Sequence, residues 1–284
     1  MFSRLKRSIK KRIVRIKAKL GLIPPLPGTQ MTDSEVEADR TKYIQLDTSK
    51  KFAMGKKYDF ICKGDKYANN GIVKDSSYFI QDIWGARKVA EHKPSVHYDV
   101  GSSVVGFIAH LLGMNQKICL IDIRPMNSLD TSFLNAGGGV RYIQADATNL
   151  EHIEDNSIES ISALCSVEHF GLGRYGDPIN PDAWYLALKS FQRVVKSGGR
   201  IYISVPVGVI DKVCFNAHRV YRPQTIIESF DKCDIVEFSY IKGFDTIICM
   251  QRDNSELKIH GDNLKSIPDI KNNGVTGLFE FIKR

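Results

Sequence analysis

Residues 96–123, VHYDVGSSVVGFIAHLLGMNQKICLIDI, decide the expected fold, because they have the pattern of a strand, a helix and a second strand in succession. The strand-like VHYDV ends at Gly101, and the apolar spacing of 106–114 predicts a helix. The apolar run 117–123 then predicts the second strand. Strands that alternate with helices favour a parallel sheet covered by helices on both faces.

The same alternation continues on both sides of this unit. Further helices are expected at 76–92, 182–196 and near 223–231, and further strands at 140–146, 157–166, 200–207, 234–241 and 244–251. Because only Lys242 and Gly243 separate the final two strands, these strands can only form a hairpin. We therefore predict an α/β fold with a doubly wound, mostly parallel seven-stranded sheet whose last strand is antiparallel.

The chain is expected to have four parts. These are a basic amphipathic helix at 1–21, a linker or N-terminal wrap at 22–75, the α/β domain at 76–251, and a polar C-terminal extension at 252–284. The 284 residues are 43% hydrophobic and 25% charged, which is typical of a globular protein.

The cysteines, the apolar runs and the spacing of possible metal ligands exclude several classes of protein. The six cysteines lie far apart without a C-x-x-C pair, which favours reduced thiols in a cytoplasmic compartment. No run of about 18 apolar residues predicts a transmembrane helix. No His, Asp or Glu grouping has the spacing of metal ligands, so no metal site is predicted.

The positive charge is concentrated at the N-terminus. Residues 1–20 hold nine basic side chains and no acidic one, so removing them from the net charge of +8 leaves −1 for the remaining 264 residues. This balance argues against nucleic acid as a partner. One side of the expected helix is apolar, which predicts binding to an anionic membrane surface. The alternative is a helix that docks on the protein itself or on a partner.

Three residues at successive strand ends predict a nucleoside-type ligand. Gly101 follows the first strand and allows a tight turn, Asp122 ends the second strand where a ribose diol would lie, and Asp146 ends the third. A dinucleotide site requires G-x-G-x-x-G, whereas 101–106 reads GSSVVG and lacks the middle glycine. This departure favours S-adenosylmethionine (SAM) over a nicotinamide dinucleotide.

The chain resembles a class I SAM-dependent methyltransferase over roughly residues 76–251. The motifs that carry this resemblance are HYDVGSS (97–103), LIDIRP (120–125), QADATNL (144–150), EDNSIESISALCSVEHFG (154–171) and RVVKSGGRIYISVPVG (193–208). Three further motifs resemble a bacterial methyltransferase-like family of unassigned function associated with surface-polysaccharide synthesis: YFIQDIW (78–84), EHFGLGRYGDPINP (168–181) and FNAHRVYRP (215–223).

The resemblance implies SAM as the cofactor and a Rossmann-like sheet. The cofactor-binding residues that it implies are Tyr78, Gln81, Asp99, Gly101, Ser102, Asp122, Ile123, Asp146, Ala147 and Ser166. Among these, Asp122 would hold the ribose hydroxyls and Asp146 the adenine amine. Ser103 and Val105 replace the usual second and third glycines of the family, which puts the affinity for the cofactor in doubt.

Methyl transfer to a sugar hydroxyl benefits from a general base. The candidates are Glu168 and His169, after the fourth strand, and His218, after the fifth; their alternative role is to brace loops. The loop 171–178 is expected to bind the acceptor. The predicted substrate-binding residues are Arg174, Tyr175, Asp177 and Arg219. A purely structural pairing of Arg174 with Asp177 is the alternative for this loop.

The expected function is O-methylation of a surface polysaccharide or lipopolysaccharide sugar, or of its precursor, at the cytoplasmic face of the membrane. The expected partners are a glycan or sugar-containing acceptor and, through residues 1–20, an anionic membrane surface. Two alternatives remain open. One is a catalytically inactive methyltransferase-like scaffold in glycan assembly. The other is an NAD-dependent sugar-nucleotide enzyme, against which the missing glycine and a missing Tyr-x-x-x-Lys pair argue.

Overall fold

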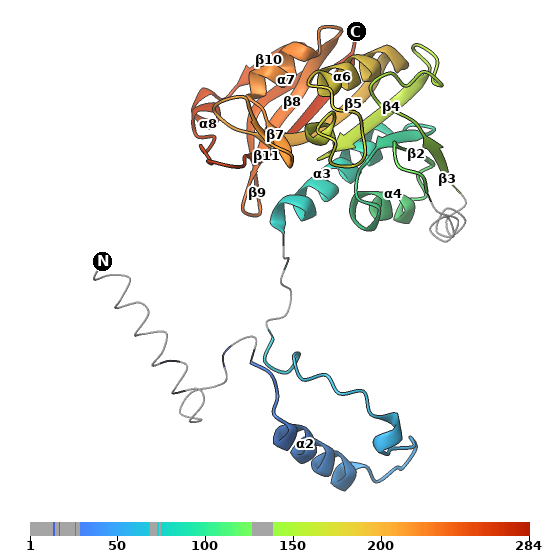
Figure 1. The fold of residues 1–284 in the computed structure, drawn as a ribbon, viewed down its shortest axis with the longest axis vertical. Helices are drawn as coiled ribbons and strands as arrows, with labels where there is room; N and C mark the ends of the chain where they lie inside the picture. The colour runs from blue at the N-terminus through green and yellow to red at the C-terminus, as the bar shows by residue number, and fades with distance from the viewer. Residues whose placement is uncertain are drawn as a thin grey trace. The chain divides into compact units, whose positions relative to one another are not determined.

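The computed structural model describes residues 29–68, 73, 75–126 and 139–284, together with Val14, Lys17 and Leu26. The chain divides into two compact units, Met1–Lys74 and Asp75–Arg284 (Figure 1). Apart from Val14 and Lys17, the helix expected at 1–21 lies outside the described residues and stays a prediction. Within the described residues, no helix is long and apolar enough to cross a membrane.

The first unit is built on helix α2 (Asp33–Leu46), followed by the short 3-10 helix η1 (Lys56–Tyr58). Thr32 caps α2, because its hydroxyl accepts from the Glu35 amide while the Glu35 carboxylate accepts from the Thr32 amide. None of the described residues of this unit is buried. The unit therefore has no apolar core in the part of the chain that the structure describes.

The second unit contains one large sheet. Among the described residues, nine strands form it in the order β10-β9-β8-β11-β5-β4-β1-β2-β3. Their bounds are β1 His97–Val100, β2 Ile118–Asp122, β3 Val140–Gln144, β4 Ile158–Leu164, β5 Val195–Val207, β8 Cys233–Lys242, β9 Asp245–Asp253, β10 Glu256–Ile259 and β11 Val275–Lys283. The pairs β3–β2, β2–β1, β1–β4 and β4–β5 are parallel. The β1–β5 side of the sheet is thus parallel throughout, in agreement with the predicted parallel sheet.

The strand count corrects the prediction, and an antiparallel strand that was not predicted lies inside the sheet. The expected hairpin forms as β8 and β9, but β11 lies between β5 and β8 and is antiparallel to both. The sheet has nine strands in the described residues, where seven were expected. The physical reason is the apolar sequence of β11, which buries Leu278 toward one face of the sheet and Phe279 and Phe281 toward the other.

Helices cover both faces of the sheet. The helices α3 (Ser76–His92) and α4 (Ala109–Gly113), with the short π-helix η2 (Val104–Ile108), pack in one apolar cluster. The helices α6 (Ala183–Val194) and α7 (Pro223–Ser229) pack in a second cluster against the opposite face. A small hairpin of β6 (Lys212–Cys214) and β7 (His218–Val220) and the 3-10 helix η3 (Val167–His169) border the ends of β4 and β5. A short helix, α8 (Gly261–Lys265), precedes β11.

Candidate functional site

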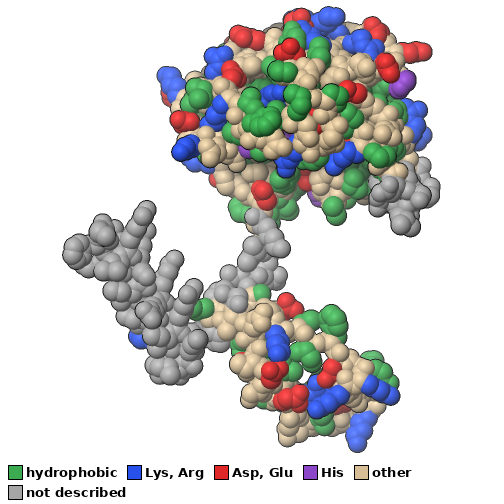
Figure 2. All heavy atoms as spheres, in the orientation of Figure 1, with side chains coloured by type: hydrophobic (Ala, Val, Ile, Leu, Met, Phe, Trp, Pro, Cys, Tyr) green, Lys and Arg blue, Asp and Glu red, His purple; other side chains and the backbone are tan. Residues whose placement is uncertain are grey.

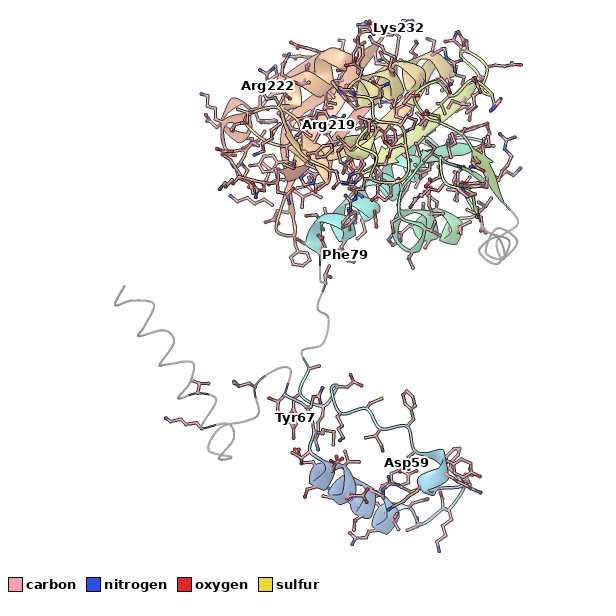
Figure 3. The ribbon with its side chains drawn as sticks, viewed as in Figure 1. Asp59, Tyr67, Phe79, Arg219, Arg222 and Lys232 are labelled. Carbon is pink, nitrogen blue, oxygen red and sulfur yellow. The ribbon has the colours of Figure 1, made fainter. Side chains whose placement is uncertain are left out.

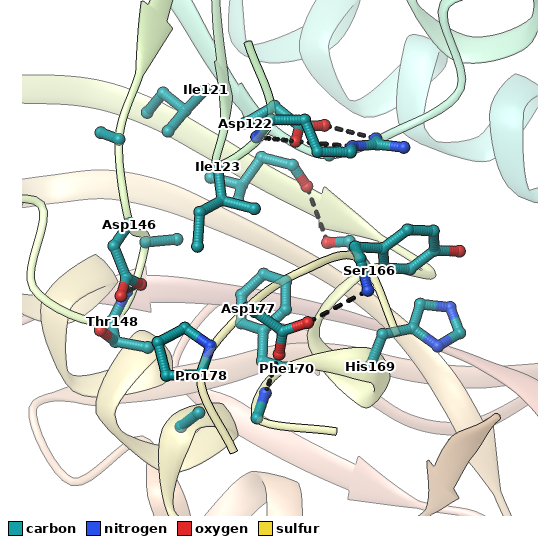
Figure 4. Close-up of a pocket in the computed structure, with 18 of the residues that line it drawn as sticks. Ile121, Asp122, Ile123, Asp146, Thr148, Ser166, His169, Phe170, Asp177 and Pro178 are labelled. Atoms are coloured by element: carbon teal, nitrogen blue, oxygen red, sulfur yellow. Dashed lines mark hydrogen bonds and ion pairs between the residues drawn. The ribbon is translucent and has the colours of Figure 1, made fainter. Parts of the chain in front are cut away.

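The chain reverses its direction of travel across the sheet at β1, since β2 and β3 lie on one side of β1 and β4 on the other. Ligands of such sheets bind outside the carboxyl ends of the strands at this point. A cavity, here called the inner chamber, lies there (Figure 4). Its walls include Gly101, Ile121, Asp122, Ile123, Asp146, Ala147, Ser166, Phe170, Asp177 and Pro178.

Gly101 makes the turn after β1. Its φ of +70° is a left-handed conformation, and a Cβ there would lie 3.2 Å from the Cβ of Ser166. Ser166 fixes this contact because its hydroxyl donates to the Val100 carbonyl at 2.7 Å. Glycine is therefore required both by the backbone conformation and by the close approach of the β4 end.

Asp99 lies behind this turn rather than in the cavity. The side chain is 1% exposed and lines neither chamber described here. Its carboxylate accepts from the Ser102 amide at 3.0 Å, the Ser102 hydroxyl at 2.6 Å and the Ser162 hydroxyl at 2.5 Å. Burial raises the pKa of Asp99 to about 6. The predicted ligand residue Asp99 thus shapes the turn, while Ser102 reaches the cavity wall.

Asp122 and Asp146 both reach the inner chamber, as expected from their places at strand ends. The Asp122 carboxylate is held by Arg124, which donates from Nε at 2.9 Å and from Nη2 at 2.6 Å (Figure 4). Asp146 accepts from the Thr148 amide at 2.8 Å through one oxygen. The carboxylate predicted to hold a ribose is therefore already paired, whereas one Asp146 oxygen has no protein partner among the described residues.

A second cavity, the outer chamber, continues from the first. The two share Gly101, Arg124, Cys165, His169 and Tyr175. The outer chamber is also lined by Tyr78, Gln81, Ser102, Ser103, Glu168, Arg174 and His218. The three predicted catalytic residues thus meet in the outer chamber, and every predicted cofactor residue except Asp99 lines one of the two.

Glu168 is the most unusual ionisable group of the outer chamber. It is 2% exposed, and burial raises its pKa to about 8. Its Oε2 atom is buried and has no hydrogen-bond partner among the described residues, and its Oε1 atom lies 3.7 Å from Nε2 of His169. A buried carboxyl oxygen without a partner is rare, and in a cavity it marks a candidate acid or base.

The two histidines are neutral near pH 7. Burial lowers the pKa of His169 to about 4 and also lowers that of His218. Nδ1 of His169 donates to the Ala217 carbonyl at 2.7 Å, which leaves Nε2 as an acceptor facing Glu168. The Nε2 atom of His218 is buried and has no partner in the described residues. Either ring can accept a hydrogen bond from a ligand hydroxyl.

The loop after η3 carries the predicted substrate residues. Asp177 accepts from the amides of Gly171 and Tyr175 and so holds the loop from within. Two guanidinium groups lie over the Tyr175 ring, that of Arg124 at 4.9 Å and that of Arg174 at 5.1 Å from the ring centroid. Arg174 donates to the Ala217 carbonyl at 2.9 Å. Tyr175 and the two arginines therefore stand at the junction of the chambers.

Arg219 has a different place from the one predicted. It is 6% exposed and lines neither chamber. Its guanidinium donates to the carbonyls of Phe170 and Pro181, at 2.5 Å and 3.3 Å. Arg219 therefore braces the loop through the carbonyls of Phe170 and Pro181 and forms no part of either chamber wall.

The missing glycines of the turn do not fill the cavity. Val105 is 92% exposed and lines neither chamber, and Ser103 contributes only to the wall of the outer one. The turn at Gly101 leaves the inner chamber open, so the residues present fit a nucleoside-type cofactor. Among the described residues, no group of three His, Cys, Asp or Glu side chains is arranged to hold a metal ion.

Sequence reasoning missed one wall of the site. Asn273, Gly274 and Thr276, at the start of β11, line the outer chamber. The signal that could have found them is the run of apolar and aromatic residues from 275 to 283, which is typical of a buried strand. The pairing of Arg124 with Asp122 was also not expected, since it depends on a side-chain conformation.

Topology and cavity together define a Rossmann-like α/β protein with a ligand crevice at the carboxyl ends of its parallel strands. A family model described as a Caenorhabditis protein of unknown function (DUF268) matches residues 141–246, which is less than half of the chain. No curated protein matches the chain.

Solved structures resemble the chain at low identity. One is Burkholderia thailandensis 1,6-didemethyltoxoflavin-N1-methyltransferase with bound S-adenosylhomocysteine, at 13% identity and a TM-score of 0.48, covering 91% of this chain and 93% of that one. A SAM-dependent methyltransferase from Clostridium acetobutylicum has 12% identity, a TM-score of 0.47, and coverages of 74% and 92%. The [4+2]-cyclase SpnF has 14% identity, a TM-score of 0.49, and coverages of 71% and 81%. These identities and TM-scores are low, so the ligand class of the crevice is inferred from the geometry of its own residues.

Proposed function

We propose that this protein is a SAM-dependent methyltransferase. The observation that carries the proposal is that Gly101, Asp122 and Asp146, from the ends of three neighbouring parallel strands, line one chamber that opens directly into a second chamber with Glu168. The first chamber suits the nucleoside part of the cofactor, with Ile123 and Ala147 beside a base and Asp146 near its amine. The second suits the acceptor.

The cofactor would supply an electrophilic methyl group on a sulfonium. The protein's part is alignment of the acceptor and removal of its proton. Glu168 is the candidate base: its ionised carboxylate, the form that predominates above its pKa of about 8, would take the proton of an acceptor hydroxyl through Oε2, which has no partner among the described residues. The neutral His169 can accept a hydrogen bond from the same acceptor through Nε2. This arrangement favours an O-methyltransferase.

The acceptor is proposed to be a sugar hydroxyl of a surface polysaccharide or lipopolysaccharide, or of its precursor. Tyr175 offers an aromatic face to a sugar ring, and Arg174 offers a guanidinium to a neighbouring phosphate or carboxylate. The sequence resemblance supports this class of acceptor. The basic residues 1–20 support a location at the cytoplasmic face of the membrane, where lipid-linked acceptors are concentrated.

A second candidate function is a methyltransferase-like scaffold without catalysis. The specific observation in its favour is the Asp122 carboxylate, whose two oxygens are both held by Arg124. This pairing competes with ribose hydroxyls for the carboxylate oxygens. The nicotinamide-dependent alternative receives no comparable observation, since the turn after β1 lacks the middle glycine of a pyrophosphate site.

Isothermal titration of the full chain with SAM, S-adenosylhomocysteine and NADH tests the proposal. We expect micromolar binding of SAM and its demethylated product and no binding of NADH. The matched variant is Glu168→Gln, which should keep cofactor affinity and lose transfer of labelled methyl to glycan acceptors. Absence of SAM and product binding would leave the scaffold as the better function, and binding of NADH alone would favour the nicotinamide enzyme.

A further inference from the structure

Residues 50–61, KKFAMGKKYDFI, form a surface that the proposed function does not use. In this stretch, here called the basic–aromatic segment, the large apolar side chains are exposed: Phe52 77%, Met54 46%, Tyr58 60%, Phe60 90% and Ile61 47%. The part of the first unit that the structure describes has no buried residue against which they could pack. Such a concentration of exposed aromatic side chains marks an interaction surface.

The charge of this surface is positive and unbalanced. Lys50, Lys51, Lys56 and Lys57 are exposed and, within the described residues, form no ion pair. Figure 2 shows apolar, basic and acidic side chains on the visible face of this unit. The acidic residue of the segment, Asp59, is neutralised by Arg40 of α2, with N–O distances of 2.5 and 3.0 Å.

The acidic residues of α2 pair with residues other than these four lysines. Asp33 pairs with Lys63 at 2.6 Å, Asp39 pairs with Lys66 at 2.8 Å, and Glu35 contacts the Tyr67 hydroxyl. Figure 3 shows Asp59 and Tyr67 along this helix. These contacts fasten residues 59–67 to α2 and leave the four lysines without an ion pair among the described residues. Lys57 lies over the neighbouring Tyr58 ring, 4.9 Å from its centroid, so a cation and an aromatic side chain are presented together on an exposed surface.

We infer that the basic–aromatic segment binds an anionic lipid surface. Protein–protein interfaces are depleted in lysine, whereas lysines interleaved with aromatic residues suit the boundary between lipid headgroups and acyl chains. The ammonium groups meet the anionic headgroups and the rings enter the boundary beneath them. The segment would be a membrane contact distinct from residues 1–20, and it does not depend on the proposed enzyme activity.

A depth-sensitive fluorescence experiment tests the contact locally. The full chain with Phe60→Trp is mixed with phosphatidylcholine vesicles containing phosphatidylserine and brominated acyl chains. The matched control is Phe244→Trp, at an exposed aromatic position (60%) of the β8–β9 hairpin flanked by one lysine and one aspartate. We expect the added tryptophan at 60 to be quenched and the one at 244 not. Equal quenching at both positions, or none at 60, would overturn the inference.

A charge series tests the electrostatic part. Lys50→Gln with Lys51→Gln should lower the partition coefficient of the full chain on anionic vesicles by about 25-fold, at about fivefold per lysine. The control is Lys242→Gln with Lys265→Gln, which replaces two exposed lysines of the second unit. This pair should change the partition coefficient by less than about twofold, because these lysines lie outside the proposed contact. Equal losses in the two pairs would contradict a local contact. If the Lys50→Gln, Lys51→Gln variant lost self-association and kept its vesicle binding, the surface would instead bind a second copy of the chain.

Discussion

The buried carboxyl of Glu168 makes the stability of the fold depend on pH. Its pKa rises from 4.5 in a free chain to about 8 in the folded protein, so folding favours the protonated form. The stabilisation is complete below pH 4.5 and is lost as the pH rises through 8. Because glutamine cannot ionise, Glu168→Gln should be more stable than the parent at pH 8 by roughly 2–4 kcal/mol.

Urea unfolding of parent and variant at pH 5 and pH 8 measures this difference. The difference should shrink toward zero at pH 5, where the parent's carboxyl is protonated in the folded state. A variant that is equally destabilised at both pH values would show that Glu168 is a structural acceptor and not a buried, poorly solvated acid. His169 supplies no similar loss at alkaline pH, because its pKa is lowered instead.

Arg124 and Asp122 should have opposite effects on cofactor affinity. Asp122→Ala removes the expected acceptor of the ribose hydroxyls and should weaken S-adenosylhomocysteine binding by about 10- to 100-fold. Arg124→Ala removes the group that holds both Asp122 oxygens and should strengthen binding several-fold. Isothermal titration of both variants gives the comparison. Unchanged affinity in Asp122→Ala would remove the ribose assignment, and weaker binding in Arg124→Ala would show that the arginine contacts the cofactor directly.

At the scale of single elements, β11 joins the two parts of the sheet, because it pairs with both β5 and β8. Phe279 is fully buried and its ring stacks on Phe238 of β8, with 4.5 Å between ring centroids. Phe279→Ala should lower the free energy of unfolding by about 3–5 kcal/mol, because it leaves a cavity between two strands. The control Phe244→Ala, at an exposed hairpin position, should change it by less than about 0.5 kcal/mol. Thermal and urea unfolding distinguish the two.

The elements near the cavity were predictable because their signals are local. The strand expected at 140–146 appears as Val140–Gln144, the strand at 157–166 as Ile158–Leu164, and the helix at 182–196 as Ala183–Val194. Strand ends then placed Gly101, Asp122 and Asp146 at one edge. The strand β11 escaped prediction because its partners β5 and β8 are distant in sequence and the polar residues before it gave the C-terminal part the composition of an extension.

The side-chain arrangement was harder to predict than the strand order. The buried state of Glu168, the bracing role of Arg219 and the pairing of Arg124 with Asp122 all depend on how loops fold back over the sheet edge. Those contacts join residues two to about fifty positions apart, and hydrophobic periodicity carries no information on them. Composition located the charge at the N-terminus but did not single out residues 50–61, whose exposure only the structure shows.

At the scale of the whole molecule, the N-terminal residues should govern location. Deleting residues 2–20 removes nine basic side chains and should move most of the protein from the membrane fraction to the soluble fraction while preserving the fold of residues 75–284, with the basic–aromatic segment retaining the remainder. Fractionation of cells that express either form checks this. If the shortened chain remains wholly with the membrane, the basic–aromatic segment or another surface is sufficient, and the role assigned to residues 1–20 is wrong.

The place of β11 in the sheet also has a consequence for biosynthesis. Every other strand of the sheet precedes β11 in the chain, yet β11 joins β5 to β8. During translation, the β1–β5 block and the β8–β10 block can each form early, but they remain separate until residues 275–283 leave the ribosome. Nascent chains would therefore expose the apolar edges of β5 and β8, and chaperone binding should be greatest in the interval before this strand emerges.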